Sequence, residues 1–325
     1  MFYSIIIPVY NRPDHIQEVL ECLVDQSFKD FEVIIVESGS PIKSDKVVES
    51  FQDKLKIRYY FKGNDGQGFS RNYGMARAEG EYFIIFDSDL IIPSTYMQTV
   101  DNSLKDNSLD VYGGPDKAHS SFTMVQKAVD FVLTSFITTG GSRGGANSVG
   151  KYRPRSFNMG ISKKVFEATK GYLLPFLGED IEFSIRIEKL GFNSGLIEEA
   201  FVYHKRKESL LGFYQQMHFF GRARININRF HKGNINLIHL VPLAFLGYLC
   251  LLLISLIWYS EDVKIVAIPL MVHASLILTT ATVVLRNPIT GVLTLVAAYC
   301  QLIGYGLGLI TEVFSNSNPL DKSKI

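Results

Sequence analysis

The stretch Tyr82–Asp89, with the sequence YFIIFDSD, decides how this chain is expected to fold. Five apolar or aromatic residues in a row are typical of a strand that is buried on both faces of a parallel sheet. Such a strand delivers Asp87 and Asp89 to the carboxyl edge of the sheet, where open α/β sheets bind their ligands. Two carboxylates one residue apart can hold a divalent cation that also binds phosphate, although Asp-Ser-Asp is also common in ordinary turns.

Strands and helices alternate on both sides of this stretch. Further strands are expected at Ile5–Val9, Phe31–Val36 and Ile57–Phe61, and helices at Pro13–Val24, Asp45–Gln52 and Phe69–Ala78. Pro13 suits the first turn of a helix, and the apolar residues that follow it recur at helical spacing. This alternation predicts an α/β fold with a doubly wound, mostly parallel sheet.

Composition narrows the class of protein. A length of 325 residues favours two regions over one small domain, and a formal net charge of +1 gives no argument for a nucleic-acid partner. The mean hydropathy of +0.13 is high for a purely soluble protein, and the apolar excess is concentrated in residues 234–314. The three cysteines form no C-x-x-C pair, so neither a zinc site nor a disulfide framework is indicated.

Three long apolar stretches predict transmembrane helices, at about residues 237–259, 263–285 and 289–314. Each reaches the roughly 20 residues that an α-helix needs to cross a bilayer. Residues 211–233 interleave aromatic and aliphatic residues with four basic ones, Arg222, Arg224, Arg229 and Lys232. This pattern predicts an amphipathic helix at the membrane interface. By the positive-inside rule, we expect a multi-pass protein of the plasma (inner) membrane with its N-terminal domain in the cytoplasm.

These features divide the chain into four expected parts. They are a domain at 1–210, the interfacial helix at 211–233, three transmembrane helices at 234–314 and a short polar tail at 315–325. Within the first part, Gly140–Arg155 is rich in glycine, serine and basic residues and has no periodicity. A segment of this kind is either a functional lid or a disordered connector, and its position beside the presumed site favours the lid.

Four separated motifs occur in an order that resembles the family 2 glycosyltransferases of the GT-A fold. They are PVYNR at Pro8–Arg12, VESGS at Val36–Ser40, GQGFSRNYG at Gly66–Gly74 leading to the Asp-Ser-Asp stretch, and GEDIEFS at Gly178–Ser184. The resemblance covers about residues 3–205. It implies a nucleotide-activated sugar as donor, Mg²⁺ or Mn²⁺ as cofactor, and inversion at the anomeric carbon.

The resemblance also implies which residues bind the donor. It places in the nucleotide-sugar pocket Pro8, Tyr10, Arg12, Gly68, Arg71, Asp87 and Ser88. Glu37 matches the acidic position that contacts the base. The family pattern has two aspartates there, whereas this chain has Glu37 and Ser38. This departure leaves the identity of the base open, and a UDP-sugar is only the preferred donor.

Metal binding and catalysis are assigned to other acidic residues by the same resemblance. Asp87 and Asp89 match the metal motif, and His204 resembles a late histidine that approaches the metal or the diphosphate in some members. Asp180 matches the catalytic base, with Glu179 as its neighbour. A hydroxyl acceptor is a poor nucleophile, so a carboxylate that takes its proton is chemically intelligible. Without the resemblance, two acids at a helix start and a structural histidine remain alternatives.

Together these features predict a membrane-anchored inverting glycosyltransferase. Its acceptor is expected to be a hydroxyl group of a lipid-linked or cell-envelope glycan, because the apolar helices hold the site close to a bilayer. A polyprenyl-phosphate glycosyltransferase, in which the lipid phosphate accepts the sugar, is the alternative within the same class. A non-catalytic, nucleotide-sugar-binding membrane scaffold is the alternative from a different class, and the intact set of carboxylates argues against it.

Overall fold

The computed structural model describes residues 2–139, 153–258 and 263–315, which form two compact units. The sheet unit comprises the described residues within Met1–His119 and Gly144–Lys205, and the helical unit those within Ser120–Arg143 and Arg206–Ser317. Residues 120–139 group with the helical unit, although they fall inside the domain expected at 1–210. Most of Gly140–Arg155, the expected lid or connector, lies outside the described residues, as does most of the tail at 315–325.

A seven-stranded sheet, in the order β3-β2-β1-β4-β8-β6-β9, forms the centre of the sheet unit. Its strands are β1 (Tyr3–Val9), β2 (Phe31–Ser38), β3 (Ile57–Lys62), β4 (Tyr82–Phe86), β6 (Val111–Gly113), β8 (Asn158–Ser162) and β9 (Ser194–Leu196). β1 pairs in parallel with β2 and β4, and β2 with β3, while β8 runs antiparallel to both β4 and β6. The predicted doubly wound, mixed and mostly parallel sheet is confirmed.

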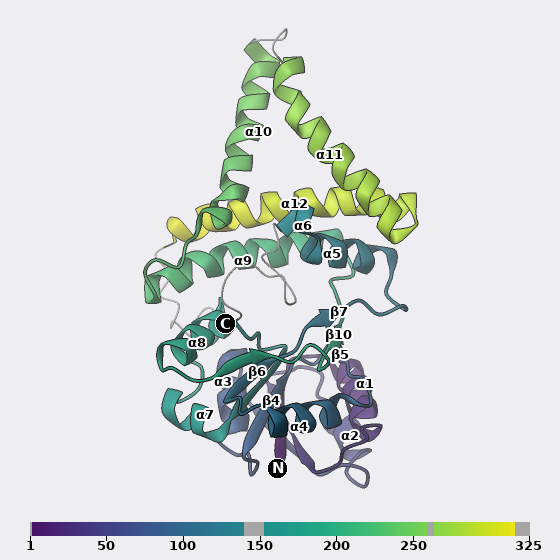
Figure 1. Cartoon of the computed structure of the whole chain (residues 1–325), viewed down its shortest axis with the longest axis vertical. Coiled ribbons are helices and arrows are strands. Elements are labelled where there is room, and N and C mark those ends of the chain that lie inside the picture. The colour runs from purple at the N-terminus through teal and green to yellow at the C-terminus, as the bar shows by residue number, and fades with distance from the viewer. Residues whose placement is uncertain (1, 140–152, 259–262, 316–325) are drawn as a thin grey trace. The chain divides into compact units, whose positions relative to one another are not determined.

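Helices cover both faces of this sheet (Figure 1). One face packs against α1 (Pro13–Val24), α2 (Asp45–Glu49) and α4 (Tyr96–Asp106), and the other against α3 (Gln67–Met75), α7 (Lys163–Thr169) and α8 (Glu179–Lys189). Successive residues of β1 serve opposite layers, since Ile5 and Ile7 join the first core and Ile6 the second. Burial of each such side chain stabilises the fold by about 1.5–3 kcal/mol. Strands with two buried faces therefore read as unbroken apolar runs.

The strand order reverses at the carboxyl ends of β1 and β4. Winding from β1 proceeds outward to β2 and β3, and then returns to β4 on the other side of β1. Ligands of open α/β sheets bind where the strand order reverses in this way. A second sheet, in the order β5-β10-β7, adjoins this edge and consists of β5 (Leu90–Ile91), β7 (Asp116–Lys117) and β10 (Val202–His204).

The helical unit contains the apolar part of the chain. Its elements are α5 (Met124–Thr134), α6 (Phe136–Thr139), α9 (Leu210–Phe230), the 3₁₀ helix η1 (Leu237–Leu240), α10 (Val241–Trp258), α11 (Val263–Leu285) and α12 (Pro288–Val313). Three helical stretches, Leu237–Trp258, Val263–Leu285 and Pro288–Val313, are long and apolar enough to cross a membrane by length and composition. The three predicted apolar helices are thus present, and α9 occupies the position of the predicted interfacial helix.

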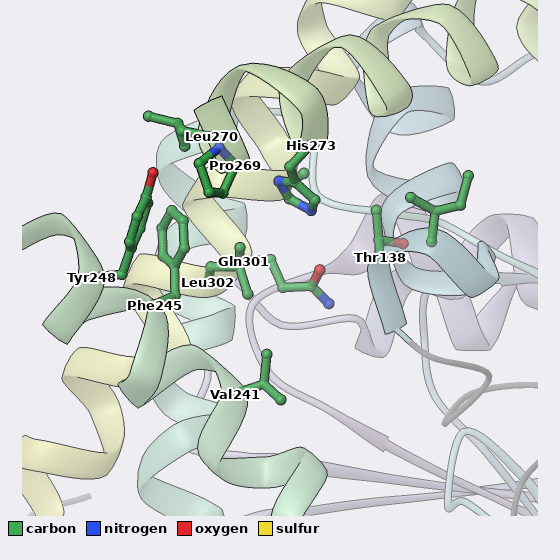
Figure 2. Close-up of a pocket in the computed structure, with 11 residues that line it drawn as sticks. Thr138, Val241, Phe245, Tyr248, Pro269, Leu270, His273, Gln301 and Leu302 are labelled. Atoms are coloured by element: carbon green, nitrogen blue, oxygen red, sulfur yellow. The ribbon is translucent and has the colours of Figure 1, made fainter. Parts of the chain in front are cut away.

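A cavity of about 250 Å³ lies between α6, α10, α11 and α12 within this unit (Figure 2). Apolar side chains such as Phe245 and Leu302 make up most of its wall. Four side chains with polar groups line it as well, namely Thr138 of α6, Tyr248 of α10, His273 of α11 and Gln301 of α12. An apolar cavity with a few polar groups is the usual form of a site for a small, mostly apolar ligand.

Candidate active site

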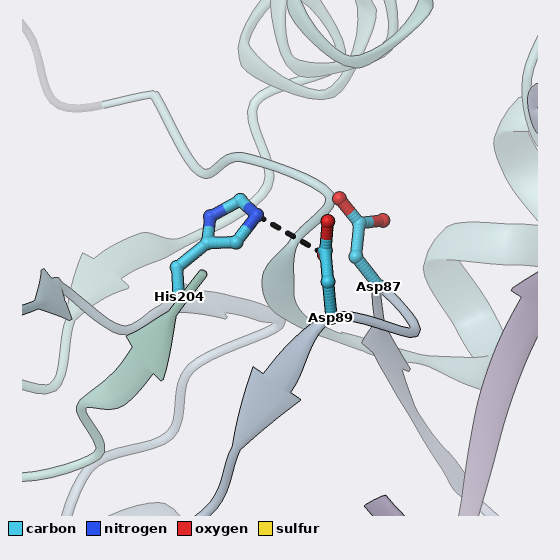
Figure 3. A group of neighbouring side chains, drawn as sticks. All are labelled: Asp87, Asp89 and His204. Carbon is cyan, nitrogen blue, oxygen red and sulfur yellow. Dashed lines mark ion pairs between the residues drawn. The ribbon is translucent and has the colours of Figure 1, made fainter. Parts of the chain in front are cut away.

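The two aspartates that follow β4 lie beside a histidine from a distant part of the chain (Figure 3). Ligand atoms of Asp87, Asp89 and His204 all lie within 4.8 Å of one another, and Nε2 of His204 is 3.2 Å from Oδ1 of Asp89. All three side chains remain partly exposed. Two carboxylates and an imidazole that converge on one point can hold a divalent cation and leave room for phosphate oxygens.

The small second sheet explains why the histidine lies there. β10 pairs antiparallel with β5, which places His204 opposite Leu90, the residue after Asp89. The backbone N–H of Lys205 donates to the carbonyl of Asp89 at 3.0 Å and ties the two segments together. On the other side of the ring, Nδ1 of His204 lies 4.0 Å from Oδ2 of Asp116.

Asp89 is held in its ionised form. Nη1 of Arg12 lies 2.8 Å from Oδ2 of Asp89. Burial acts to raise the pKa of Asp89, but His204 and Arg12 outweigh that effect and hold the pKa well below its usual range. The carboxylate is therefore available as an anionic ligand at neutral pH.

A buried arginine connects the aspartates to the start of α8. The guanidinium of Arg71 donates to Oδ1 of Asp87 at 2.8 Å and to Oε1 of Glu179 at 3.0 Å, and it lies over the ring of Tyr172. Arg71 is only 1% exposed. Burial alone would lower its pKa, but Asp87 and Glu179 outweigh that effect, so Arg71 stays charged. One cation thus joins three elements: α3, the end of β4 and α8.

Glu179 and Asp180 are neighbours in sequence with different surroundings. Glu179 is buried and accepts hydrogen bonds from Arg71 and Gln67. Burial, reinforced by the charge of Asp180 and opposed by Arg71, raises the pKa of Glu179 to about 7. The side chain of Asp180 is 22% exposed, and one of its oxygens lies 3.5 Å from Nη1 of Arg155. Of the two, Asp180 is the carboxylate that solvent can reach.

Local backbone geometry produces this difference. Gly178, the residue before α8, has a φ of 92°, a left-handed conformation that glycine adopts without steric cost. The chain therefore turns sharply into the helix, with Glu179 buried at its first position. The helix N-terminus favours the charged form of nearby carboxylates.

The remaining residues predicted to bind the donor have varied positions. Pro8 is in β1, and Tyr10, directly after it, is 53% exposed. Ser88 is largely buried between the two aspartates. A Cβ atom at Gly68 would lie 2.2 Å from the carbonyl oxygen of Leu174, so close packing of two backbones already requires a glycine there.

Glu37 lies at the end of β2 and is fully buried. Its carboxylate accepts from the backbone N–H of Ser44 at 2.8 Å and from the hydroxyl of Tyr59 at 2.5 Å. Among the described residues, no contact joins it to the acidic cluster. The hydroxyl of Ser44 donates to the same carboxylate at 3.4 Å, so a contact with the base stays a prediction that would have to coexist with three hydrogen bonds.

Some residues of the site carried little signal in the sequence. Gln67 lies in a motif, and Arg155 in a glycine-rich segment, but neither residue was itself predicted to belong to the site. Asp116 and Tyr172 lie in segments without a recognisable motif. Their proximity to His204 and Arg71 depends on chain segments that only the folded sheet brings together.

Comparison with known proteins shows what the first half of the chain resembles. Residues 4–157 match the model of the family described as glycosyl transferase family 2. An uncharacterized glycosyltransferase of Rickettsia typhi is 35% identical over 126 residues, which are 37% of this chain and 39% of that protein. The uncharacterized glycosyltransferase EpsJ of Bacillus subtilis is 32% identical over 111 residues, 34% of this chain and 32% of EpsJ. The chain thus spans about two fifths or less of the length of each of these relatives.

A solved structure shares the fold over most of the chain. The mannosyltransferase PcManGT from Pyrobaculum calidifontis, in complex with GDP-Man and Mn²⁺, superposes with a TM-score of 0.67 at 16% identity, over 93% of this chain and 87% of that one. At this identity the likeness concerns the fold. Residues 4–157 are thus similar to the glycosyl transferases of family 2, and the sheet unit has the GT-A type of fold.

Proposed function

We propose that this protein is a membrane-anchored, metal-dependent inverting glycosyltransferase that moves a sugar from a nucleoside diphosphate to a hydroxyl acceptor. One observation carries the proposal. Asp87, Asp89 and His204 converge at the carboxyl end of β4, and Arg71 links them to the helix that bears Asp180. A scaffold that only binds a nucleotide sugar would have no use for an accessible carboxylate at the start of α8.

The donor would bind at the carboxyl ends of β1 and β4, where the strand order reverses. Pro8, Tyr10 and Arg12 would border the nucleoside, and Gly68, Arg71 and Ser88 the diphosphate and sugar. PcManGT is in complex with GDP-Man, and a TarS fragment of S. aureus, with a TM-score of 0.50, is in complex with UDP-GlcNAc. These neighbours support a nucleotide sugar without deciding the base. We retain a UDP-sugar as the preferred donor.

Asp87, Asp89 and His204 would hold Mg²⁺ or Mn²⁺. Such a cation acts as a Lewis acid that stabilises the charge of the departing diphosphate. Arg71 keeps Asp87 oriented through its hydrogen bond. Arg12, now paired with Asp89, has a planar guanidinium that suits phosphate oxygens.

Asp180 would act as the general base. It takes the proton of the acceptor hydroxyl while the hydroxyl oxygen attacks the anomeric carbon from the side opposite the diphosphate. The bond between that carbon and the diphosphate oxygen breaks, and the oxygen keeps the electron pair. A single displacement of this kind inverts the configuration. General-base assistance typically accelerates such a reaction by ~10²–10⁴-fold.

The acceptor is proposed to be lipid-linked. Support comes from the apolar helices and from the cavity between α6, α10, α11 and α12, which suits an apolar chain. Filling that cavity by Ala298→Phe should raise KM for the acceptor and leave hydrolysis of the donor unchanged. Val283→Phe, at a side chain that is 74% exposed, is the matched control. If the acceptor KM does not change in Ala298→Phe, the acceptor does not bind in this cavity.

Membrane location follows from the same helices. The basic residues of and just after α9 support a cytoplasmic position of the glycosyltransferase domain at the plasma membrane, by the positive-inside rule. A lipid-linked acceptor in the cytoplasmic leaflet and a soluble nucleotide sugar would then both reach the site.

The test uses the purified full chain with a panel of nucleotide sugars and a membrane lipid extract. We expect mass spectrometry to detect a glycosylated lipid and the released nucleoside diphosphate, only when Mg²⁺ or Mn²⁺ is present. Asp89→Ala should abolish both products. Absence of nucleotide release with every donor, or release that EDTA does not affect, would refute the proposal. A product that still forms at nearly the full rate in Asp180→Asn would instead favour a lipid phosphate as acceptor, because an ionised phosphate needs no base.

A further inference from the structure

We propose that α12 does not cross the membrane, but lies beside α9 in the headgroup region of the leaflet where α10 begins and α11 ends. Only α10 and α11 would then span the bilayer. This inference concerns the helical unit alone and does not depend on the proposed reaction. Length and hydropathy favour a third span, but the contacts of α12 indicate a different position.

The first observation is the set of α10 and α11 residues that α12 touches. At Gly306, a Cβ atom would lie 2.8 Å from the carbonyl oxygen of Pro242, in the first turn of α10. At Gly291, it would lie 3.3 Å from the carbonyl oxygen of Leu278, and 2.2 Å from Oγ1 of Thr282, near the end of α11. The two glycines are about 22 Å apart along the helix, at about 1.5 Å per residue.

Two consecutive spans cross a bilayer in opposite directions, so the start of α10 and the end of α11 lie on the same side. Gly291 and Gly306 contact these two regions and therefore lie at the same side as well. A third span would carry Gly306 towards the far side, next to Trp258 or Val263. Between the glycines, Tyr299 stacks on Phe245, which is also near the start of α10, with ring centroids 5.7 Å apart. The middle of α12 therefore also lies on the side of the membrane where α10 begins.

The second observation is the close pairing of α12 with α9, which run side by side in Figure 1. Cβ atoms at Gly304 and Gly308 would lie 2.8 Å from the carbonyl oxygen of Tyr214 and 2.1 Å from that of His218. Gly221 of α9 faces the carbonyl oxygen of Tyr305 in the same way. Glycines at all three contacts let the two backbones touch, as small residues do in membrane helix pairs.

α9 cannot lie inside the hydrocarbon. It bears Arg222, Arg224 and Arg229 within its last turns, and charged side chains in the bilayer core are costly. Because the second half of α12 is packed along α9, it must lie at the depth of α9. That depth is the membrane interface.

The third observation is an ion pair that a third span would forbid. Glu312, one residue before the end of α12, is 1% exposed. Its carboxylate lies 2.9 Å from Nε of Arg222 and 2.7 Å from Nη1 of Arg229. If α12 crossed the membrane, a hydrocarbon layer of about 30 Å would separate Glu312 from both arginines.

Burial explains why α12 is nevertheless apolar. In its most apolar stretch, 39% of the residues are buried by protein, compared with 6% for the stretch containing α10 and 11% for α11. Ala297 and Ala298, for instance, are in a core shared with α5 and α9. Hydropathy responds equally to burial in lipid and to burial in protein. The apolar face of α12 is thus partly a protein core.

Single cysteines test this topology in a full chain in which Cys22, Cys250 and Cys300 are replaced by serine. Lys54→Cys reports the side of the sheet unit, Lys264→Cys the far end of the two spans, and Ser323→Cys the side reached after α12. The probe is a membrane-impermeant maleimide, applied to right-side-out and inside-out vesicles. We expect Ser323→Cys to react from the same side as Lys54→Cys, and Lys264→Cys from the opposite side. Reaction of Ser323→Cys from the side of Lys264→Cys would overturn the proposal.

A second measurement tests depth, and it also covers the case in which α12 dips into the bilayer and returns. Nitroxide labels are placed on exposed positions along α12, namely Ile289, Val292, Val296, Leu307, Ile310 and Val313. Power saturation with oxygen and a water-soluble nickel complex then gives the depth of each label. We expect similar shallow depths throughout. A maximum of depth in the middle of the helix, with aqueous accessibility at both ends, would refute an in-plane helix.

Discussion

The two units each contain a buried glutamate held by arginine, and the two sites differ in their balance of charge. In the sheet unit, Glu179 shares Arg71 with Asp87, and Asp180 adds a further acid next to it. In the helical unit, the single carboxylate of Glu312 forms ion pairs with two arginines, Arg222 and Arg229. The first site keeps excess negative charge that a cation or a proton can neutralise. The second holds one carboxylate between two guanidinium groups, so it has no excess negative charge, and it joins two helices.

The comparison shows that a buried ion pair has no fixed meaning. Removing one partner of such a pair leaves a buried charge without compensation, which typically costs about 3–5 kcal/mol. The pair becomes part of a site only where further acids converge on it and remain accessible, as Asp87 and Asp180 do. Variants of the two sites test this difference.

Asp180→Asn should lower kcat with a hydroxyl acceptor by ~10²–10⁴-fold, because the amide cannot take the proton of the attacking hydroxyl. Thermal stability should hardly change, since the side chain is partly exposed and is not enclosed by Arg71. Steady-state release of the nucleoside diphosphate and a melting curve of the same preparation measure both quantities. Full turnover in this variant would show that Asp180 is not the general base.

Arg71→Met should lower the free energy of unfolding by about 3–5 kcal/mol, because Asp87 and Glu179 would lose their shared buried cation. The exposed Arg77, just after α3, offers the matched control. Arg77→Met should change stability by no more than about 0.5 kcal/mol. Thermal unfolding of the full chain in detergent micelles compares the two variants, and equal melting temperatures would contradict the structural role of Arg71.

Glu312→Gln should destabilise the protein by about 1–3 kcal/mol, since the amide keeps a hydrogen-bond acceptor but loses the charge that holds two arginines. Hydrolysis of a soluble donor should stay unchanged, in contrast to the variants of the first site. A donor hydrolysis rate that falls as far as in Asp180→Asn would show that the two carboxylate sites are not separate in function.

Gly308→Ala should cost about 1–3 kcal/mol, because the added Cβ would lie 2.1 Å from the carbonyl oxygen of His218 and force α9 and α12 apart. Gly247→Ala in α10 is the control, because no atom lies within 4 Å of its added Cβ. The difference between the two melting temperatures isolates the helix contact. Equal melting temperatures of the two alanine variants would show that α9 and α12 do not approach each other closely at Gly308.

Glu179→Gln should remove a pH dependence of stability. The folded-state pKa of Glu179 is raised from 4.5 to about 7, so folding favours the protonated form. The associated stabilisation is complete below about pH 4.5 and is lost as the pH rises through about 7. Between pH 5 and 8 the melting temperature of the wild type should therefore fall relative to that of Glu179→Gln. Parallel curves across this range would show that Arg71 keeps Glu179 ionised throughout.

Much of the architecture could be predicted from local sequence patterns. The apolar run before Asp87 predicted the central strand, which is β4, because only a strand buried on both faces lacks polar alternation. The three apolar stretches gave helix limits within a few residues of Trp258, Leu285 and Val313, because length and hydropathy are properties of single segments. The acids of α8 were also found in advance, because Gly178 and the residues after it form a contiguous motif.

What depends on distant segments could not be read in this way. His204 approaches Asp89 only because β10 pairs with β5, and Glu37 is enclosed by Ser44 and Tyr59 only after β3 joins β2. Residues 120–139 belong with the helical unit for a similar reason, since their apolar side chains meet α9 and α12 only in the folded state. Hydropathy likewise cannot distinguish an apolar face that meets lipid from one that meets protein. Local patterns therefore determined the elements of this protein, whereas the contacts that make its site, and those of α12 with α9, arise from pairing between segments far apart in the chain.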